Sequence, residues 1–127
     1  MAEKENHSDI IAGVDLGSAT DEVADILIDL ARRETKIFST RFATTLVGSV
    51  KKTMRLNKNP MRSASFVVLK APDVPSVLLE LGYMSSKEDL KLLTSAEWRE
   101  EVAEAMVRAI DGFFAARAAG GIDSGVN

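Results

Sequence analysis

The 127-residue sequence contains no cysteine, and this absence excludes several kinds of site. Without thiols there is no disulfide framework, no thiolate metal site and no cysteine nucleophile. The sequence has one histidine, His7, whereas a zinc site needs at least three protein ligands. Glu3 and His7 have the four-residue spacing that two metal ligands on a helix would use, but no third ligand is visible. We therefore expect His7 to be a solvated helical side chain.

Long hydrophobic runs and a strong net charge are absent too. No apolar run approaches the roughly 18 residues that a membrane span needs, and the first segment, MAEKENHSD, is too polar for a secretory signal. The formal net charge of −3 gives no preference for nucleic acid or acidic lipid. We expect no transmembrane segment and no nucleic-acid partner, and a protein outside the cytoplasm would carry its signal on a longer precursor.

The composition of the sequence suits one folded domain, because 46% of its residues are hydrophobic. Apolar periodicity predicts a short helix over residues 1–13, a long helix over 21–54, and further helices over 85–93 and 96–117. The long helix is either continuous or bent near residues 35–40. Its apolar positions recur at spacings of three and four: Val23, Ile26, Leu27, Leu30, Ile37, Phe38, Phe42, Leu46 and Val50. The expected N-caps of the last two helices are Ser85 or Ser86, and Thr94 or Ser95.

Two segments between these helices are predicted to be strands, Ser65–Lys70 and Ser76–Glu80, because they are rich in apolar and β-branched residues. The connector APDVP is too short for a parallel crossover, so direct pairing would be antiparallel. Strands this apolar need cover on both faces and neighbours on both edges. We therefore expect an α/β fold with helices packed on a mixed sheet, present here as a partial domain with about two strands and four helices.

Glu80 ends the second predicted strand, and Gly82 follows it closely. A buried carboxylate without a partner costs several kcal/mol, or becomes more basic. One explanation is a neutralising cation such as Arg62 or Lys70. The other is that the increased basicity serves catalysis, with Gly82 leaving room for a substrate. The residues alone leave both explanations open.

The stretch SASFVVLKAPDVPSVLLELGYMSSKEDLKLL resembles the end of the catalytic domain of zinc-dependent N-acetylmuramoyl-L-alanine amidases. It contains an F-x-V-L segment, a Pro-x-x-L-x-E segment, and then Gly, an aromatic residue and a serine before a helix. The segment AEKENHSDIIAGVDL and the long helix after it resemble the inserted helical segment of periplasmic members. Ser86 stands where the family usually has Asn, and either residue caps a helix. The family's His–Glu–His zinc ligands, which belong to the first half of the domain, have no counterpart here.

The resemblance implies a peptidoglycan hydrolase that cleaves the amide bond between N-acetylmuramic acid and L-alanine, in cell-wall remodelling and daughter-cell separation. It implies that Glu80 is the catalytic general base. It also implies zinc in the complete enzyme but none in this chain, and a periplasmic or cell-envelope location. The implied partners are peptidoglycan and an activator protein that displaces the inserted helix. The candidates to cover the active site are Glu3, Glu5 and Glu22.

On this interpretation residues 1–118 are the C-terminal part of an amidase catalytic domain. Residues 2–56 are the inserted regulatory segment, although a plain packing helix explains them as well. Residues 62–118 are a strand–strand–helix–helix core, and 119–127 are a flexible tail. We expect the chain by itself to be inactive because it lacks a zinc ligand set. The alternative function is a non-catalytic helical interaction or regulatory module derived from an amidase.

Overall fold

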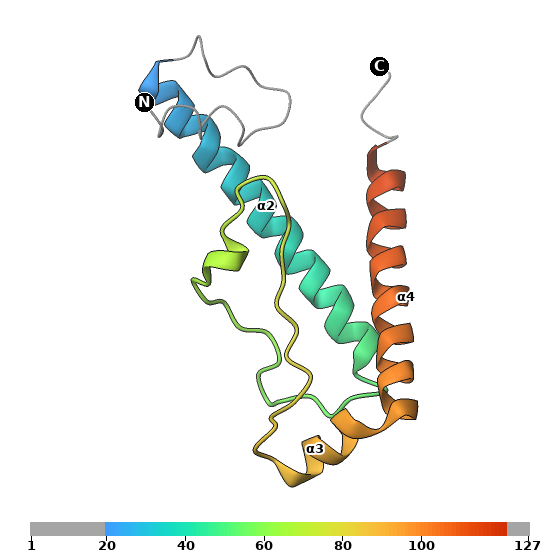
Figure 1. Ribbon diagram of the computed structural model, residues 1–127. Coiled ribbons are helices and arrows are strands. Elements are labelled where there is room, and N and C mark those ends of the chain that lie inside the picture. The colour runs from blue at the N-terminus through green and yellow to red at the C-terminus, as the bar shows by residue number, and fades with distance from the viewer. Residues whose placement is uncertain (1–19, 122–127) are drawn as a thin grey trace. The chain divides into compact units, whose positions relative to one another are not determined.

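The computed structural model describes residues 20–121 (Figure 1). The elements in chain order are α2 (Asp21–Val50), the 3-10 helix η2 (Val67–Leu69), α3 (Lys87–Thr94) and α4 (Ala96–Gly121). The three longer helices confirm the predictions for these parts of the chain, and α2 is one continuous helix. The helix predicted over residues 1–13, with Glu3, Glu5 and His7, lies outside the described residues.

The predicted mixed sheet is wrong, because residues 20–121 contain no strand. The first predicted strand contains a turn of 3-10 helix instead, with the amide of Lys70 donating to the carbonyl of Val67 at 3.1 Å. The second, Ser76–Glu80, is irregular backbone. A strand is stable only when its backbone groups pair with a neighbour. Neither segment has such a neighbour in the described chain, and Val67 stays 83% exposed. The described fold is therefore helical rather than α/β.

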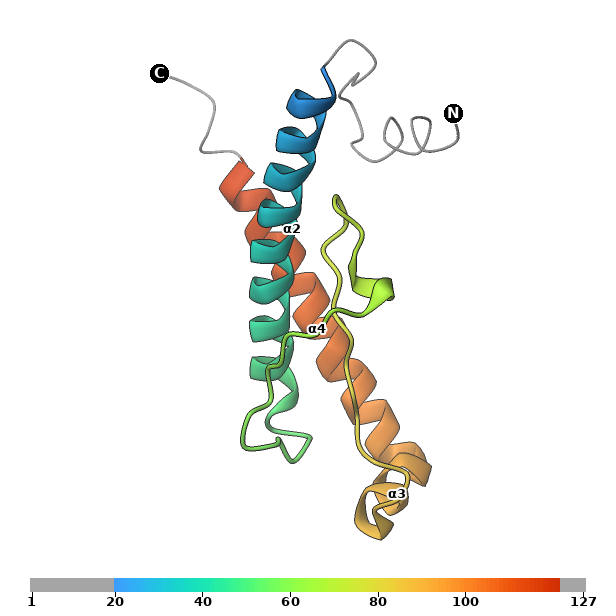
Figure 2. The same cartoon turned by 90° about the vertical axis from the view of Figure 1, so that its left-hand side faces the viewer.

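Backbone contacts divide the chain into two compact units, and α2 contributes to both. The first unit comprises residues 1–40 and 64–78. Within its described part, the Thr35 hydroxyl donates to the Pro72 carbonyl at 2.7 Å, and the Ser39 hydroxyl accepts from the Ser76 amide at 3.0 Å. These two bonds hold the 64–78 segment along one face of α2 (Figure 2).

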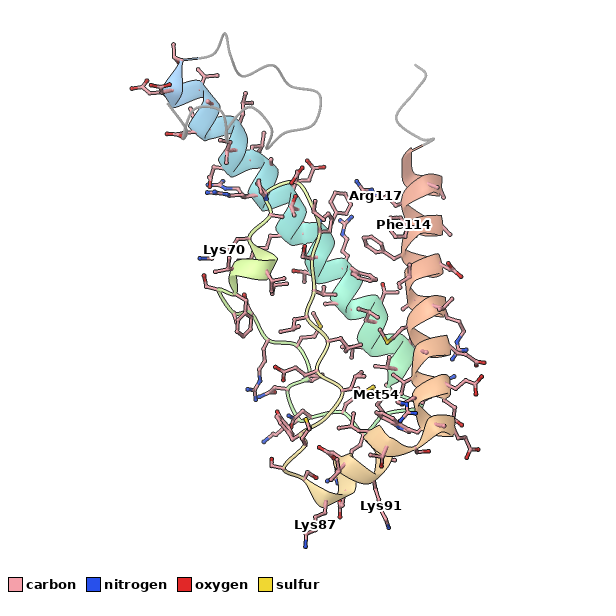
Figure 3. The ribbon with its side chains drawn as sticks, in the orientation of Figure 1. Met54, Lys70, Lys87, Lys91, Phe114 and Arg117 are labelled. Carbon is pink, nitrogen blue, oxygen red and sulfur yellow. The ribbon has the colours of Figure 1, made fainter. Side chains whose placement is uncertain are left out.

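The second unit, residues 41–63 and 79–127, contains a hydrophobic core between the end of α2 and the start of α4. Its buried members are Val50, Met54, Trp98, Val102 and Ala105. The Trp98 indole donates to the Thr53 carbonyl at 3.3 Å, and Met54 lies beside the first turns of α4 (Figure 3). Trp98, Val102 and Ala105 recur at spacings of four and three, so they lie on one face of the helix predicted over residues 96–117.

Serine side chains begin both C-terminal helices. Ser86 accepts a hydrogen bond from the amide of Asp89 at 3.2 Å, and Ser95 accepts one from the amide of Trp98 at 3.3 Å. Each bond satisfies an amide that has no partner inside the first turn of its helix. The structure thus selects Ser86 and Ser95 from the pairs of predicted N-caps.

The apolar residues of α2 separate onto two faces. Ile28, Leu46 and Val50 are buried, and the hydroxyls of Thr35 and Ser39 lie on the same face. At 3.6 residues per turn, four of the predicted apolar positions point the opposite way. These four are exposed: Val23, Ile26, Leu30 and Ile37. Periodicity therefore identifies the helix correctly but does not distinguish its covered apolar residues from these four exposed ones.

Candidate functional site

Glu80 lies in irregular backbone at the start of the 79–127 stretch, and its side chain is exposed. The sequence predicts a carboxylate at the end of a buried strand, and that burial is wrong for the chain as described. Within its own unit Glu80 forms no ion pair with Arg62 or with any other described residue. Lys70, the other predicted counter-ion, belongs to the first unit. Glu80 is therefore explained neither by a neutralising cation in its own unit nor by burial that increases its basicity.

A tight turn follows Glu80 and is fastened to the first turn of α3. The Tyr83 amide donates to Oδ2 of Asp89 at 2.9 Å, and the Ser86 amide donates to the Tyr83 carbonyl at 3.0 Å. Gly82 lies against the same carboxylate, because a Cβ built on it would be 3.1 Å from the Cβ of Asp89. Real Cβ atoms rarely come so close. The chain can approach α3 this tightly only because residue 82 is glycine.

A hydrophobic contact holds the residue just after Glu80. Leu81 is half-buried and packs against the core of the second unit, together with Leu93 of α3. Glu80 is therefore attached through its next neighbour to packed side chains, and through Gly82 and Tyr83 to a hydrogen-bonded turn. These contacts fix the position of the backbone from which the Glu80 side chain extends, although its carboxylate faces solvent. This is the property that a positioned acid or base requires.

The surroundings of the turn carry charges of both signs. Glu88 and Asp89 occupy the first turn of α3, where the helix dipole favours anions. Glu88 also approaches Arg55 at 3.7 Å, with both side chains more than 80% exposed. Lys87 and Lys91 point away from α3 (Figure 3). Among these groups Glu80 is the carboxylate without an ion-pair or hydrogen-bond partner in the described chain.

The described residues do not form a metal site. Between residues 20 and 121, no three histidine, cysteine, aspartate or glutamate side chains are close enough together to hold an ion. Glu22, which the resemblance makes a candidate to cover an active site, is exposed in the first turn of α2. The described residues thus offer no ligand set for the zinc that the resemblance implies in the complete enzyme. No helix in the same range is long and apolar enough to cross a membrane.

The helix predicted over residues 85–93 places Asp89 in its first turn, and that prediction includes no second role for this side chain. The side chain accepts from the amide of Tyr83, six residues earlier, and so joins the turn after Glu80 to α3. The local signal was the Ser86-x-x-Asp89 spacing, which is typical of a capping box. In the usual box the acidic side chain reaches back to the N-cap amide, whereas here it reaches three residues further.

Comparison with known proteins places these residues in a family. The family profile described as N-acetylmuramoyl-L-alanine amidase matches residues 7–112, a range that includes Glu80 and α3. The chain is 35% identical over 116 residues to N-acetylmuramoyl-L-alanine amidase AmiC of Escherichia coli O6:H1. It is 30% identical over 114 residues to AmiA of Escherichia coli K12, and 38% identical over 72 residues to the probable cell wall amidase LytH of Staphylococcus saprophyticus.

These matches cover most of this chain but a minor part of each relative. They span 91% of this chain against AmiC, 90% against AmiA and 57% against LytH. The corresponding shares of the relatives are 27%, 39% and 25%. Because the family profile extends over far more than half of the sequence, the chain belongs to the N-acetylmuramoyl-L-alanine amidase family.

Proposed function

We propose that this chain is the C-terminal part of a peptidoglycan amidase, and that the complete enzyme hydrolyses the amide bond between N-acetylmuramic acid and L-alanine. The observation that carries the proposal is the family match across Glu80 and the turn that supports it. The relatives are named for this activity, and they are much longer than the stretch that matches. The proposed role is cell-wall remodelling, including separation of daughter cells.

Glu80 acts as the general base in this proposal. Its carboxylate takes a proton from the water that attacks the amide carbon, and later returns a proton to the leaving nitrogen of L-alanine as the carbon–nitrogen bond breaks. Both transfers need the carboxylate within hydrogen-bonding distance of the reacting atoms. The contacts of Leu81 and Tyr83 hold the backbone on the C-terminal side of Glu80, which supports such a placement.

The complete enzyme uses zinc in this proposal, with ligands outside residues 20–121. Zinc supplies electrostatic stabilisation and an activated water when bound. Since the described residues offer no set of three ligands, this chain alone is proposed to be inactive. A non-catalytic module derived from an amidase is the alternative, and activity of a reconstituted domain separates the two.

The segment over residues 2–56 is proposed to regulate access to the active site. Glu22 is one candidate to reach the site, with Glu3 and Glu5 beyond the described residues. An activator protein would then displace the segment. Supporting this, most of the described part of the segment is a long helix with many exposed side chains. The proposed location is the periplasm or cell envelope, where peptidoglycan is found.

A chimera tests the catalytic assignment. This chain replaces the matching part of Escherichia coli AmiA, and release of peptide from purified peptidoglycan is measured. We expect the chimera to be active and Glu80→Gln to lower its rate by roughly 10²–10⁴-fold, the usual contribution of a positioned acid or base. The zinc content of the chimera should not change.

Glu100→Gln is the matched control, because Glu100 is an exposed glutamate on α4 and should be replaceable without effect. Thermal melting of each variant separates lost catalysis from lost folding. A folded, zinc-loaded chimera that works equally well with Gln at position 80 would refute the role of Glu80. A folded, zinc-loaded chimera without activity would favour the non-catalytic module.

A further inference from the structure

Residues 23–37 of α2 expose a narrow apolar stripe, which we call the α2 stripe. Its four members are 46%, 67%, 61% and 54% exposed, in chain order: Val23, Ile26, Leu30 and Ile37. The opposite face of the helix is occupied by residues 64–78 through the bonds of Thr35 and Ser39. Exposed apolar residues scattered singly are ordinary, but aligned ones mark an interaction surface.

The spacing of the α2 stripe fits another helix. Positions 23, 30 and 37 are seven apart, and 26 lies three after the first, which corresponds to positions a and d of a heptad. Arg33 occupies the next d position. A shallow depression on this face is lined by Asp25, Ile26, Asp29, Leu30 and Arg33. Four of these, at 26, 29, 30 and 33, have the spacing of a hole that receives one side chain from a facing helix.

The charges beside the α2 stripe favour an antiparallel orientation of the facing helix over a parallel one. The flanking residues on one side are Glu22, Asp29 and Lys36, and on the other side Leu27, Glu34 and Arg41. A parallel pair of α2 helices would bring Asp29 towards Glu34 and Lys36 towards Arg41 of the partner, which are like charges. An antiparallel pair brings Glu22 of one copy towards Lys36 of the other, twice. Neither Glu22 nor Lys36 has an ion-pair partner in the described chain.

We infer that the α2 stripe is the interface of a homodimer in which α2 pairs antiparallel with α2 of a second copy. Such an interface is self-complementary, as a two-fold axis requires. Near the axis, Ile26 of each copy packs against Leu30 of the other. The two Asp29 side chains approach each other there, and each is already paired with its own Arg33 at 3.1 Å. This proposal does not depend on amidase activity.

Sedimentation velocity of the full chain over a range of concentrations measures the dimer. We expect the molar mass to rise from one chain to two as concentration increases. Leu30→Glu should leave a monomer throughout, because it places a charge at the centre of the apolar contact. Leu30 is already exposed, so circular dichroism should show unchanged helix content. The matched control is Val107→Glu, on an exposed part of α4, which should dimerise normally.

Charge exchange tests the orientation separately. Glu22→Lys and Lys36→Glu each replace two attractive pairs by two repulsive ones, and each should raise the dimer Kd by about tenfold at low salt. The double variant should restore the Kd to within about twofold of the original, since both pairs are attractive again. Failure of the double variant to recover would overturn the antiparallel arrangement. So would a dimer that survives Leu30→Glu.

A chain that stays monomeric at every concentration would overturn the inference as a whole. This is the outcome expected if residues 1–19 of the same chain cover the stripe. A stripe that binds an activator protein and not a second copy would also leave the purified chain monomeric, and adding that activator would then give a complex of the two proteins.

Discussion

Replacement of Asp89 by alanine tests whether the turn after Glu80 is held from α3. Oδ2 of Asp89 accepts from the Tyr83 amide at 2.9 Å, and its own amide begins the capped turn of α3. A hydrogen bond to a charged group contributes about 1.5–3 kcal/mol. An anion in the first turn of a helix adds about 0.3–1 kcal/mol. Because Asp89 is only half-buried, we expect the free energy of unfolding to fall by about 2 kcal/mol, near the lower limit.

Glu88→Ala is the matched control for this change. Glu88 occupies the same helix turn and has the same charge, so its removal loses a similar stabilising interaction with the helix dipole. Its further contribution is an exposed pair with Arg55 at 3.7 Å, which is worth about 0.5 kcal/mol. The difference between the two variants is therefore the contribution of the bond to Tyr83 less about 0.5 kcal/mol for the Arg55 pair.

Urea unfolding followed by tryptophan fluorescence is the assay, since Trp98 is the single tryptophan and lies in the core. We expect Asp89→Ala to lose about 1 kcal/mol more than Glu88→Ala, with equal slopes against urea. Equal losses in the two variants would show that the turn does not depend on Asp89. In that case the local support proposed for Glu80 would rest on the packing of Leu81 and on the bond from the Ser86 amide to the Tyr83 carbonyl.

Two further outcomes are expected of the same chain. Val102→Ala should lower the free energy of unfolding by about 1–3 kcal/mol, measured by urea unfolding, because Val102 is only 2% exposed in the core and its methyl groups would leave a cavity. The purified chain should retain no stoichiometric zinc after dialysis, measured by elemental analysis, because His7 is its single histidine and the sequence has no cysteine. Stoichiometric zinc retained at micromolar concentration would contradict the proposal that the ligands lie elsewhere.

The helices of the fold could be predicted because their signals are local. Ser86 and Ser95 each stand before an apolar pattern of helical period, and the hydroxyl of each accepts the amide three residues later. The core could be predicted in part for the same reason, since Trp98 and Val102 share one face of α4. These features depend on residues within one or two turns of each other.

The sheet could not be predicted, because a strand depends on neighbours that its own sequence does not contain. Val67 and Val68 have the β-branched side chains typical of strands, and both remain more than 70% exposed. A 3-10 turn satisfies local backbone groups with bonds from Leu69 to Phe66 and from Lys70 to Val67. Apolar composition therefore indicates that a segment tends to be buried. Whether the segment becomes a strand depends on a neighbouring strand that pairs with its backbone.

The same distinction applies to Glu80. Sequence reasoning explained this residue by burial, and the structure leaves it exposed while holding the residues that follow it. Burial depends on what covers the carboxylate, whereas the position of the backbone depends on Leu81, Gly82 and the bond from Tyr83 to Asp89. The contacts of Gly82 and Tyr83 with Asp89 lie within ten residues of Glu80, and Leu81 packs against the core of the same unit. For a catalytic role, Glu80 therefore needs the rest of the enzyme to bury its carboxylate and to supply the zinc and the substrate-binding residues. The AmiA chimera would supply these parts.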